Sequence, residues 1–348
     1  MKSLPILFLC IIVTVGQAQK ASIEGLGDFP GGKFESTAQG ISGDGSVVVG
    51  SGTTASGKHA FRWTSASGMV DIGDTSMKET WAYATSLDGT VVVGSGDMGK
   101  GWNAYKGFFW RKDYGFVQPA YFHELARYEF WRVSSDGTVL VGDGGQQAFR
   151  WTADSGVVSL GILPGRNSSR AISVSSDGSV VIGSSYNLPA WDKEEAFRWT
   201  QKDGITGLGF LPGGNISFAT AVSPNGCVVV GTANDSSGYP AFRWDRQSGL
   251  VRLGHLPGKN TTHPFGITYD GFVIVGSSFK NRNSGTAFIW DQKNGIRPLQ
   301  NVLASDYGME PAGWDLQAAT GISYDGKVIV GWGKNPSGNQ EAFRIILK

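Results

Sequence analysis

The chain has 348 residues, and 52 of them are glycine, roughly twice the ordinary share of ~7 %. This glycine content fits many tight turns and argues against long helices. The 30 basic and 29 acidic residues leave a net charge of +1, which gives no electrostatic case for nucleic acid or an anionic membrane as a partner.

The first segment has the form of a secretory signal peptide. Lys2 supplies a positive start, residues 4–15 are apolar, and the small-residue sequence "GQA" follows at 16–18. The apolar run is shorter than the ~20 residues that a membrane-spanning helix needs. We therefore expect cleavage near Ala18, no membrane insertion afterwards, and one folded domain over 19–348 that is secreted or periplasmic.

The rest of the chain is built from a repeat. The phrase "ISGDGSVVVGSG" at 41–52 recurs, and its "VVVG" glycine returns at intervals of 41 to 55 residues. A second phrase of the type "AFRW" follows each copy, and a third that ends in "LG" or "IG" follows most of them. Self-similarity at such a period is typical of repeat architectures. The "VVVG" glycines are Gly50, Gly94, Gly142, Gly183, Gly231, Gly276 and Gly331.

Each repeat predicts four short strands. The first strand leads to an Asp-Gly turn, as at Asp44 and Gly45, which favours a tight hairpin because both central residues tolerate positive φ. The second strand is the β-branched "SVVVG" phrase, the third is "AFRW", and the fourth is the apolar third phrase. Four strands per repeat are typical of propeller blades. We predict an all-β protein, a seven-bladed β-propeller of four-stranded blades.

The two ends of the chain complement each other. The last repeat stops after "EAFRIILK" without a fourth strand, whereas "ASIEGLGDFPGG" at 21–32 is a fourth strand with no repeat before it. We expect residues 22–28 to complete the last blade, so that the N-terminal strand closes the ring and leaves no open sheet edge. An open β-solenoid is the alternative, but it does not account for these complementary ends.

The phrases "LGDFPGG", "GISGDGSVVVG", "HAFRWT" and "GMVDIG" resemble the extracellular HAF repeats of bacterial proteins. That family is named for a His-Ala-Phe triplet, which stands here unaltered as His59, Ala60 and Phe61. The resemblance extends over essentially the whole chain after residue 18. It implies an exported β-rich repeat protein, and it assigns no activity and no catalytic residues.

In the predicted propeller, the loops between strands two and three share one rim with the connections between successive blades. We call this the variable rim, because its segments 96–106, 117–131, 184–195 and 299–315 depart most from the repeat. Aromatic side chains beside carboxylates suit sugar rings and protein hot spots, although the same aromatics can simply pack loops onto blades. The candidate binding residues there are Trp102, Tyr105, Tyr121, His123, Tyr186, Trp191, Asp192, Glu194, Tyr307 and Trp314.

Arg132 breaks a pattern of small residues in the first strands. We expect this column to face a crowded axis, where Arg132 would project into the channel. There it would meet an anionic ligand or a carboxylate such as Glu124 or Glu129, or it would fill the channel as a structural plug. The small residues aligned with it are Gly40, Ala84, Ser173, Ala221, Gly266 and Gly321.

Signals for catalysis are weak. None of the four histidines has zinc-ligand spacing, and no nucleophile elbow, phosphate loop or DxDxDG calcium loop is present, so we predict no metal and no cofactor. His123 with Glu124 would suit an acid–base pair. Asp192 with Glu194 would suit glycoside hydrolysis if the two carboxylates were correctly spaced.

The sequence thus favours a monomeric, non-catalytic binding module whose ligand is a glycan or a protein surface on the variable rim. Two alternatives stay open. One is a polysaccharide lyase or hydrolase that works in the axial pocket, and the other is a structural surface protein without a small ligand.

Overall fold

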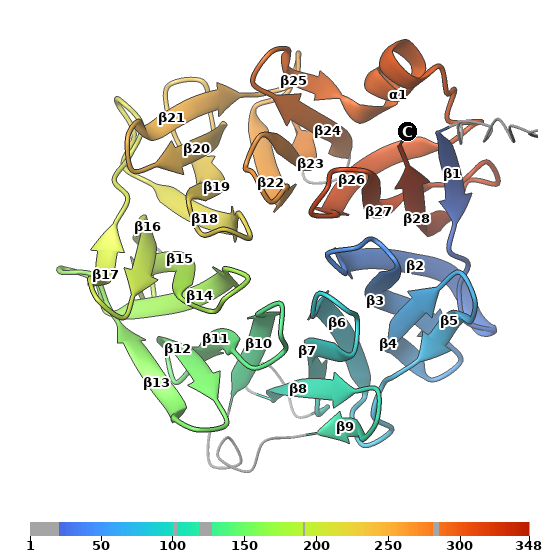
Figure 1. Cartoon of the computed structure of the whole chain (residues 1–348), viewed down its shortest axis with the longest axis horizontal. Coiled ribbons are helices and arrows are strands. Elements are labelled where there is room, and N and C mark those ends of the chain that lie inside the picture. The colour runs from blue at the N-terminus through green and yellow to red at the C-terminus, as the bar shows by residue number, and fades with distance from the viewer. Residues whose placement is uncertain (1–20, 100–103, 118–126, 191, 281–284, 348) are drawn as a thin grey trace, which may run out of the picture.

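The computed structural model describes residues 21–99, 104–117, 127–190, 192–280 and 285–347. Within these residues the chain is almost entirely β, with strands β1 to β28 and one helix, α1. Figure 1 shows small sheets arranged as a ring around a central axis, with the inner strand of each sheet nearest the axis.

Consecutive strands pair antiparallel in groups of four. We number these four-strand groups 1 to 7 in chain order. One parallel residue pair links group 1 to group 7, and another links group 2 to group 3. Groups 1 to 3 are β2 (Gly31–Ile41), β3 (Val47–Thr54), β4 (Gly57–Thr64), β5 (Gly68–Asp71); β6 (Glu79–Thr85), β7 (Val91–Asp97), β8 (Tyr105–Arg111), β9 (Gly115–Val117); and β10 (Tyr128–Val133), β11 (Leu140–Gly144), β12 (Gln147–Thr152), β13 (Gly156–Gly161).

The remaining groups follow the same order, except that the last one takes its fourth strand from the start of the chain. Groups 4 to 7 are β14 (Ser168–Val174), β15 (Val180–Asn187), β16 (Asp192–Thr200), β17 (Gly204–Gly207); β18 (Ser217–Val222), β19 (Val228–Ala233), β20 (Ala241–Asp245), β21 (Gly249–Gly254); β22 (Thr261–Ile267), β23 (Val273–Phe279), β24 (Gly285–Asp291), β25 (Gly295–Pro298); and β26 (Asp315–Ile322), β27 (Val328–Lys334), β28 (Gln340–Ile346), β1 (Ser22–Gly25).

The repeated phrases supply the core. Val48 and Val49 of the second strand and Phe61 of the third strand are fully buried, as expected for β-branched and aromatic residues packed on both faces of a sheet. Gly50 must be glycine, because a Cβ at this position would overlap the carbonyl oxygen of Thr37 on the neighbouring strand. The same overlap with the first strand recurs at Gly94, Gly142, Gly183, Gly231, Gly276 and Gly331.

Every first strand carries a bulge at the same place. In β2 the register shifts between Ala38 and Gly40, so that Gln39 has no partner residue on β3. A Cβ on Gly40 would lie 2.8 Å from the carbonyl oxygen of Tyr83 in the next group. Small residues are therefore required where adjacent inner strands approach, as the aligned column predicts. The equivalent bulges lie between Ala82/Ala84, Phe130/Arg132, Ala171/Ser173, Ala219/Ala221, Pro264/Gly266 and Ala319/Gly321.

The Asp-Gly turns differ from the expected two-residue hairpin. In the first of them only Gly45 has positive φ, at 76°, and the loop is longer because Ser42 bonds back to Val47 through its main chain and its hydroxyl. The hydroxyl of Ser42 also donates to Asp44 Oδ1 at 2.6 Å. The Ser42 hydroxyl thus forms hydrogen bonds with both Val47 and Asp44 inside the loop, and Asp44 does not adopt a positive φ.

A recurring pair of hydrogen bonds among three residues, which we call the clip, joins neighbouring groups. The main-chain N–H of Ala196, in an "AFRW" phrase, donates to Ser217 Oγ of the next group at 3.0 Å, and Ser217 donates to the carbonyl oxygen of Gly209 at 2.7 Å. Each buried hydroxyl is therefore used as both donor and acceptor. The same alanine-to-hydroxyl bond joins Ala60 to Thr80 and Ala148 to Ser169.

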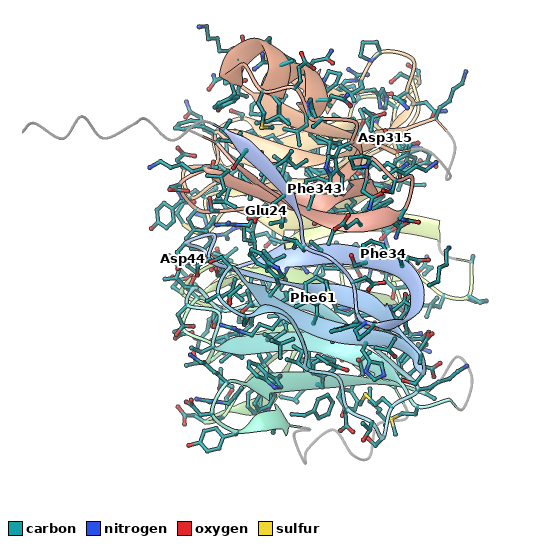
Figure 2. The ribbon with its side chains drawn as sticks, turned by 90° about the vertical axis from the view of Figure 1, so that its right-hand side faces the viewer. Glu24, Phe34, Asp44, Phe61, Asp315 and Phe343 are labelled. Carbon is teal, nitrogen blue, oxygen red and sulfur yellow. The ribbon has the colours of Figure 1, made fainter. Side chains whose placement is uncertain are left out.

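The first and last groups are joined by this clip as well. The Ala342 N–H donates to Ser36 Oγ at 3.1 Å, and Ser36 donates to the Gly27 carbonyl oxygen at 2.6 Å. β1 pairs antiparallel with β28, and Arg344 forms an ion pair with Glu24 at 2.9 Å. Figure 2 shows β1, which carries Glu24, lying against the strand that carries Phe343.

The segment at 299–315 departs from the prediction of an open rim loop. Residues Leu299–Tyr307 form helix α1, which packs its apolar residues Leu299, Val302 and Leu303 against the core beside β24 and β25. The helix ends at Gly308, whose φ of 59° provides the left-handed C-cap. α1 lies at the outer edge of the ring (Figure 1).

Candidate functional site

Charged and aromatic side chains from groups 2, 3 and 4 gather on the variable rim. We call this set the rim cluster. It brings together segments that lie far apart in the sequence, at the starts of the first and third strands and at the ends of the second strands. Its members are Tyr105, Arg127, Glu129, Trp131, Asp143, Arg170, Tyr186 and Glu194.

The centre of the rim cluster is a pair of carboxylates. Glu129 and Asp143 are direct partners across β10 and β11, so their side chains lie on one face of the sheet. Glu129 is only 4 % exposed, and Asp143 accepts a hydrogen bond from Trp131 Nε1 at 2.7 Å. Burial raises the pKa of both carboxyl groups, and their mutual repulsion adds to the rise for Glu129.

Two arginines offset this negative charge and contact aromatic rings. Arg127 donates to Glu129 Oε1 through Nε at 3.1 Å, and its guanidinium lies 5.7 Å from the ring centre of Tyr105. Arg170 donates to Glu194 Oε1 at 2.9 Å and lies 5.5 Å from the ring centre of Tyr186. These cation–π contacts hold the guanidinium groups in fixed positions.

This arrangement offers two kinds of chemistry. Fixed carboxylates and guanidinium groups beside aromatic faces can hold the hydroxyls and C–H faces of a sugar, or anchor a protein side chain. A carboxyl group whose pKa is raised by burial is also suited to act as a general acid.

The structure brings together three of the predicted rim residues: Tyr105, Tyr186 and Glu194. Asp192 begins β16. Trp314 is buried at 8 % exposure and stacks edge-on against Phe343, so it belongs to the core rather than to an open binding surface. Tyr307 lies on α1 and packs against the same core cluster. Trp102, Tyr121, His123 and Trp191 lie outside the described residues.

Arg132 lies at the axis, in the column of small residues. Its Nη1 donates to the carbonyl oxygens of Trp131 at 2.9 Å and Tyr83 at 3.5 Å. Glu129, one of the two carboxylates suggested as a partner, bonds to Arg127 instead. The other suggested partner, Glu124, lies outside the described residues.

Sequence reasoning did not single out Arg127, Asp143 and Arg170. One signal for Asp143 was present. It stands in "VGDG" where the other copies have a hydroxyl residue or Trp332 after the glycine, as in Ser51, Ser95, Ser184, Thr232 and Ser277. Arg170 had no such signal, because first-strand residues at its register position differ in every group.

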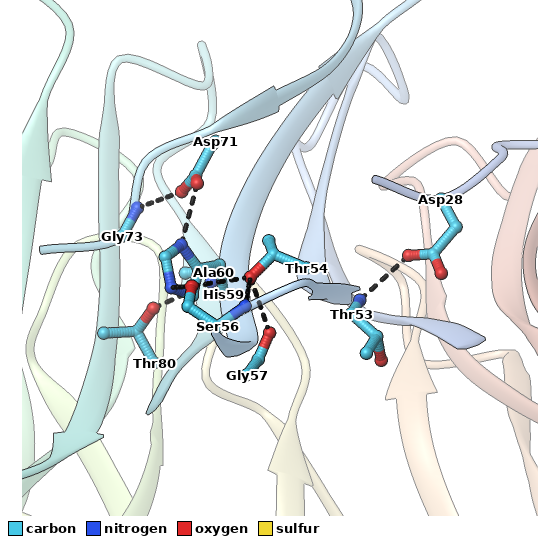
Figure 3. Close-up of polar contacts among 10 residues, drawn as sticks. All are labelled: Asp28, Thr53, Thr54, Ser56, Gly57, His59, Ala60, Asp71, Gly73 and Thr80. Carbon is cyan, nitrogen blue, oxygen red and sulfur yellow. Dashed lines mark hydrogen bonds and ion pairs between the residues drawn. The ribbon is translucent and has the colours of Figure 1, made fainter. Parts of the chain in front are cut away.

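A second polar cluster contains His59 and Ala60 of the His-Ala-Phe triplet (Figure 3). His59 Nδ1 lies 2.8 Å from Asp71 Oδ2, and His59 Nε2 lies 3.3 Å from Ser56 Oγ. A serine, a histidine and an aspartate in contact in this order resemble the catalytic triad of acyl-transfer enzymes. However, the Ser56 N–H donates to Thr54 Oγ1 at 3.1 Å, so it is not available to stabilise an oxyanion. We assign this cluster to fixing the turn at 54–57 against β5.

Grooves also lie between groups on the opposite rim, where the Asp-Gly turns lie. One of about 830 Å³ includes Trp151, Trp199 and Arg150, and the next one along includes Trp199 and Arg198. Because these grooves repeat with the "AFRW" phrase, they are features of the scaffold. Arg150 is engaged there by donating to the Gly178 carbonyl oxygen at 3.1 Å.

In the part of the chain that the structure describes, no helix is long and apolar enough to cross a membrane. No protein-family model and no curated protein matches the chain. Solved structures do match. The β-propeller domain of Cps50 (Swd1) from Myceliophteria thermophila has a TM-score of 0.58 at 11 % identity, over 94 % of this chain and 100 % of that one.

The β-propeller domain of the Trilobed protease from Pyrococcus furiosus has a TM-score of 0.56 at 8 % identity, over 94 % of this chain and 95 % of that one. At such low identity the similarity concerns the fold alone. Together with the four-strand groups, it confirms the prediction of an all-β protein with the β-propeller fold.

Proposed function

We propose that the chain is a seven-bladed β-propeller closed by its own N-terminal strand. The pairing of β1 with β28 supports this proposal, because it gives the last group the fourth strand that its own segment lacks. The Ala342–Ser36 clip supports it further, since it repeats across the chain ends the bond that joins internal groups.

We also propose that this propeller is an exported, monomeric binding module whose rim cluster holds a carbohydrate. The observation that carries the proposal is the convergence of Tyr105, Arg127, Glu129, Arg170 and Tyr186 from three groups. Such a site presents fixed hydrogen-bonding groups beside aromatic rings. The signal-peptide form of residues 1–18 and the resemblance to HAF repeats support export.

Calorimetric titration of the purified protein with soluble polysaccharides tests this proposal. We expect saturable binding, weakened about tenfold or more by Tyr105→Ala, because a stacking face is lost. The matched control is Tyr114→Ala, since Tyr114 is 76 % exposed and lies on the opposite rim. Equal affinities for both variants would contradict a rim-cluster site. Binding only to cell-surface proteins would favour a protein ligand, and no binding at all a structural role.

A second candidate is a polysaccharide-active enzyme. The observation that favours it is the Glu129–Asp143 pair, two neighbouring carboxyl groups whose pKa values are both raised by burial, as suits a general acid. Release of reducing or unsaturated ends, lost in Glu129→Gln and Asp143→Asn, would support this candidate. Binding without product would argue against it.

A further inference from the structure

Two cavities lie along the axis and share part of their lining. One of about 120 Å³ extends toward the Asp-Gly turns, where it is lined by Pro224 and Tyr324. The other, of about 290 Å³, extends toward the variable rim, where it is lined by Phe279 and Trp332. The residues that line both are Gln39, Arg132, Phe265 and Thr320.

A side chain crosses the channel at the end where the Asp-Gly turns lie. The hydroxyl of Tyr324, from group 7, lies 2.8 Å from Ser135 Oγ of group 3 and accepts a hydrogen bond from Ser176 Oγ of group 4 at 3.1 Å. A side chain thus bridges opposite sides of the ring at this end. A ligand would therefore enter the larger cavity from the variable rim.

The larger cavity contains a cation, Arg132, that has no carboxylate partner among the described residues. Among the described residues that line either cavity there is no aspartate or glutamate. The Nε and Nη2 of Arg132 have no hydrogen-bond partner in the described parts of the chain, and neither atom is sealed inside protein. The surroundings are so poorly hydrated that they lower the pKa of Arg132 to about 10.

Other donors face the same space. Trp332 and Gln39 line the cavity with Arg132, and neither the indole N–H nor the side-chain amide has a bond to another described residue. Phe265, Phe279 and Ala318 supply apolar walls. The two hydroxyls are already engaged, since Ser277 donates to the Gln317 carbonyl oxygen at 2.7 Å and Thr320 to that of Ala38 at 2.8 Å.

We propose that the axial cavity binds a small organic anion, with its carboxylate or phosphate on Arg132 and an aromatic or aliphatic body between Phe265, Phe279 and Trp332. The guanidinium fork matches the geometry of such oxyanions and gains most from them where water is scarce. A volume of about 290 Å³ lies near the lower end of small-molecule pockets, which start at about 300 Å³. This site is separate from the rim cluster, and it needs none of that cluster's residues.

The test is calorimetric titration of the purified protein with phenylacetate, phenyl phosphate and the neutral phenylacetamide. We expect one anion bound per chain, and phenylacetamide bound at least about tenfold more weakly. Arg132→Gln should lose at least about tenfold in affinity, with Arg132→Lys between it and the wild type. Trp332→Phe keeps the apolar wall but removes the N–H, and it should cost a factor of a few.

The matched control is Arg111→Gln, because Arg111 is exposed and lies outside both axial cavities. It should bind the anions as the wild type does. Thermal melts establish that each variant is folded before titration. The proposal is wrong if neither anion binds with a Kd below about 10 mM. It is also wrong if folded Arg132→Gln binds as tightly as the wild type, or if phenylacetamide binds as tightly as phenylacetate.

Discussion

Glu129 and Asp143 stand directly opposite each other on antiparallel strands, with both carboxylates on one face of the sheet, and Glu129 is almost fully buried. Like charges in such positions destabilise a sheet unless cations or protons compensate them. Here Arg127 bonds directly to Glu129, and the positive charges of Arg127 and Arg170 also act on Asp143.

This pair predicts a pH dependence of stability. Because the pKa of Glu129 is raised in the folded protein, its contribution is most favourable below the ordinary carboxyl pKa of 4.5 and is lost as the pH rises through the folded-state pKa. Glu129→Gln should therefore reduce the decline in melting temperature above pH 4.5. Melting curves from pH 4 to pH 8 check this expectation. Glu310→Gln, at an exposed position, is the control and should leave the slope unchanged.

Protonation of His263 predicts the opposite pH dependence, in which stability increases with pH. Its ring lies 5.0 Å from that of Phe279, its Nδ1 lies 2.8 Å from Thr232 Oγ1, and burial lowers its pKa to about 4. The neutral side chain stabilises the fold fully above pH 6.5, and this contribution is lost as the pH falls toward 4. NMR titration of the histidine ring protons should find one histidine still neutral at pH 5. An ordinary midpoint near 6.5 for His263 would contradict its burial.

The turn serines predict a local stability effect. Ser175 is fully buried, accepts a hydrogen bond from the Val180 N–H at 2.9 Å and donates to Asp177 at 2.6 Å. Ser175→Ala leaves that buried N–H without a partner and should lower the free energy of unfolding by about 1–3 kcal/mol. Denaturant unfolding measures the change. The control is Ser337→Ala at an exposed position, which should change the free energy of unfolding little.

The clip between the chain ends predicts that the junction of groups 7 and 1 is as strong as an internal junction. Ser36→Ala and Ser217→Ala remove equivalent hydroxyls, and each should cost about 1–3 kcal/mol. Urea unfolding of both variants compares them directly. A negligible cost for Ser36→Ala beside a clear cost for Ser217→Ala would mean that the ring is not held closed at its ends in solution.

Replacement of Arg132 separates a binding role from a plugging role. Arg132→Met keeps much of the side-chain volume and removes a poorly hydrated charge. The free energy of unfolding should stay the same or rise, by up to roughly 3 kcal/mol. A loss of that size would instead indicate that Arg132 serves mainly to hold the inner strands together through its bonds to Trp131 and Tyr83.

The sequence predicted the fold far better than the site, for a physical reason. The repeated glycines and valines are fixed by contacts inside each group, such as that of Gly50 with Thr37, so they recur and can be counted. Helix α1 escaped notice because its apolar residues, at 299, 302 and 303, occupy a single short helical face within a β-repeat chain.

Side chains that differ from one repeat to the next have no such regular signal. Arg132 was expected at the axis because it departs from a column of small residues, and it lies there. The partnership of Arg170 with Glu194 depends on one particular register, and the burial of Trp314 depends on where the neighbouring segment packs. Neither can be read from spacing along the chain.

The Asp-Gly side of the ring also carries a circle of main-chain bonds between adjacent turns, in which the Leu87 N–H donates to the Ser135 carbonyl oxygen, Ser135 to Ser176 and Ser176 to Pro224. Pro224 has no N–H and therefore cannot donate the corresponding bond to group 6. The seam between groups 5 and 6 therefore lacks a bond that its neighbours possess, even though the chain is covalently continuous there. This seam relies instead on bonds farther along the strands, such as that from Thr232 Oγ1 to the Thr262 carbonyl oxygen at 2.8 Å and that from Thr220 Oγ1 to the Pro264 carbonyl oxygen at 2.6 Å.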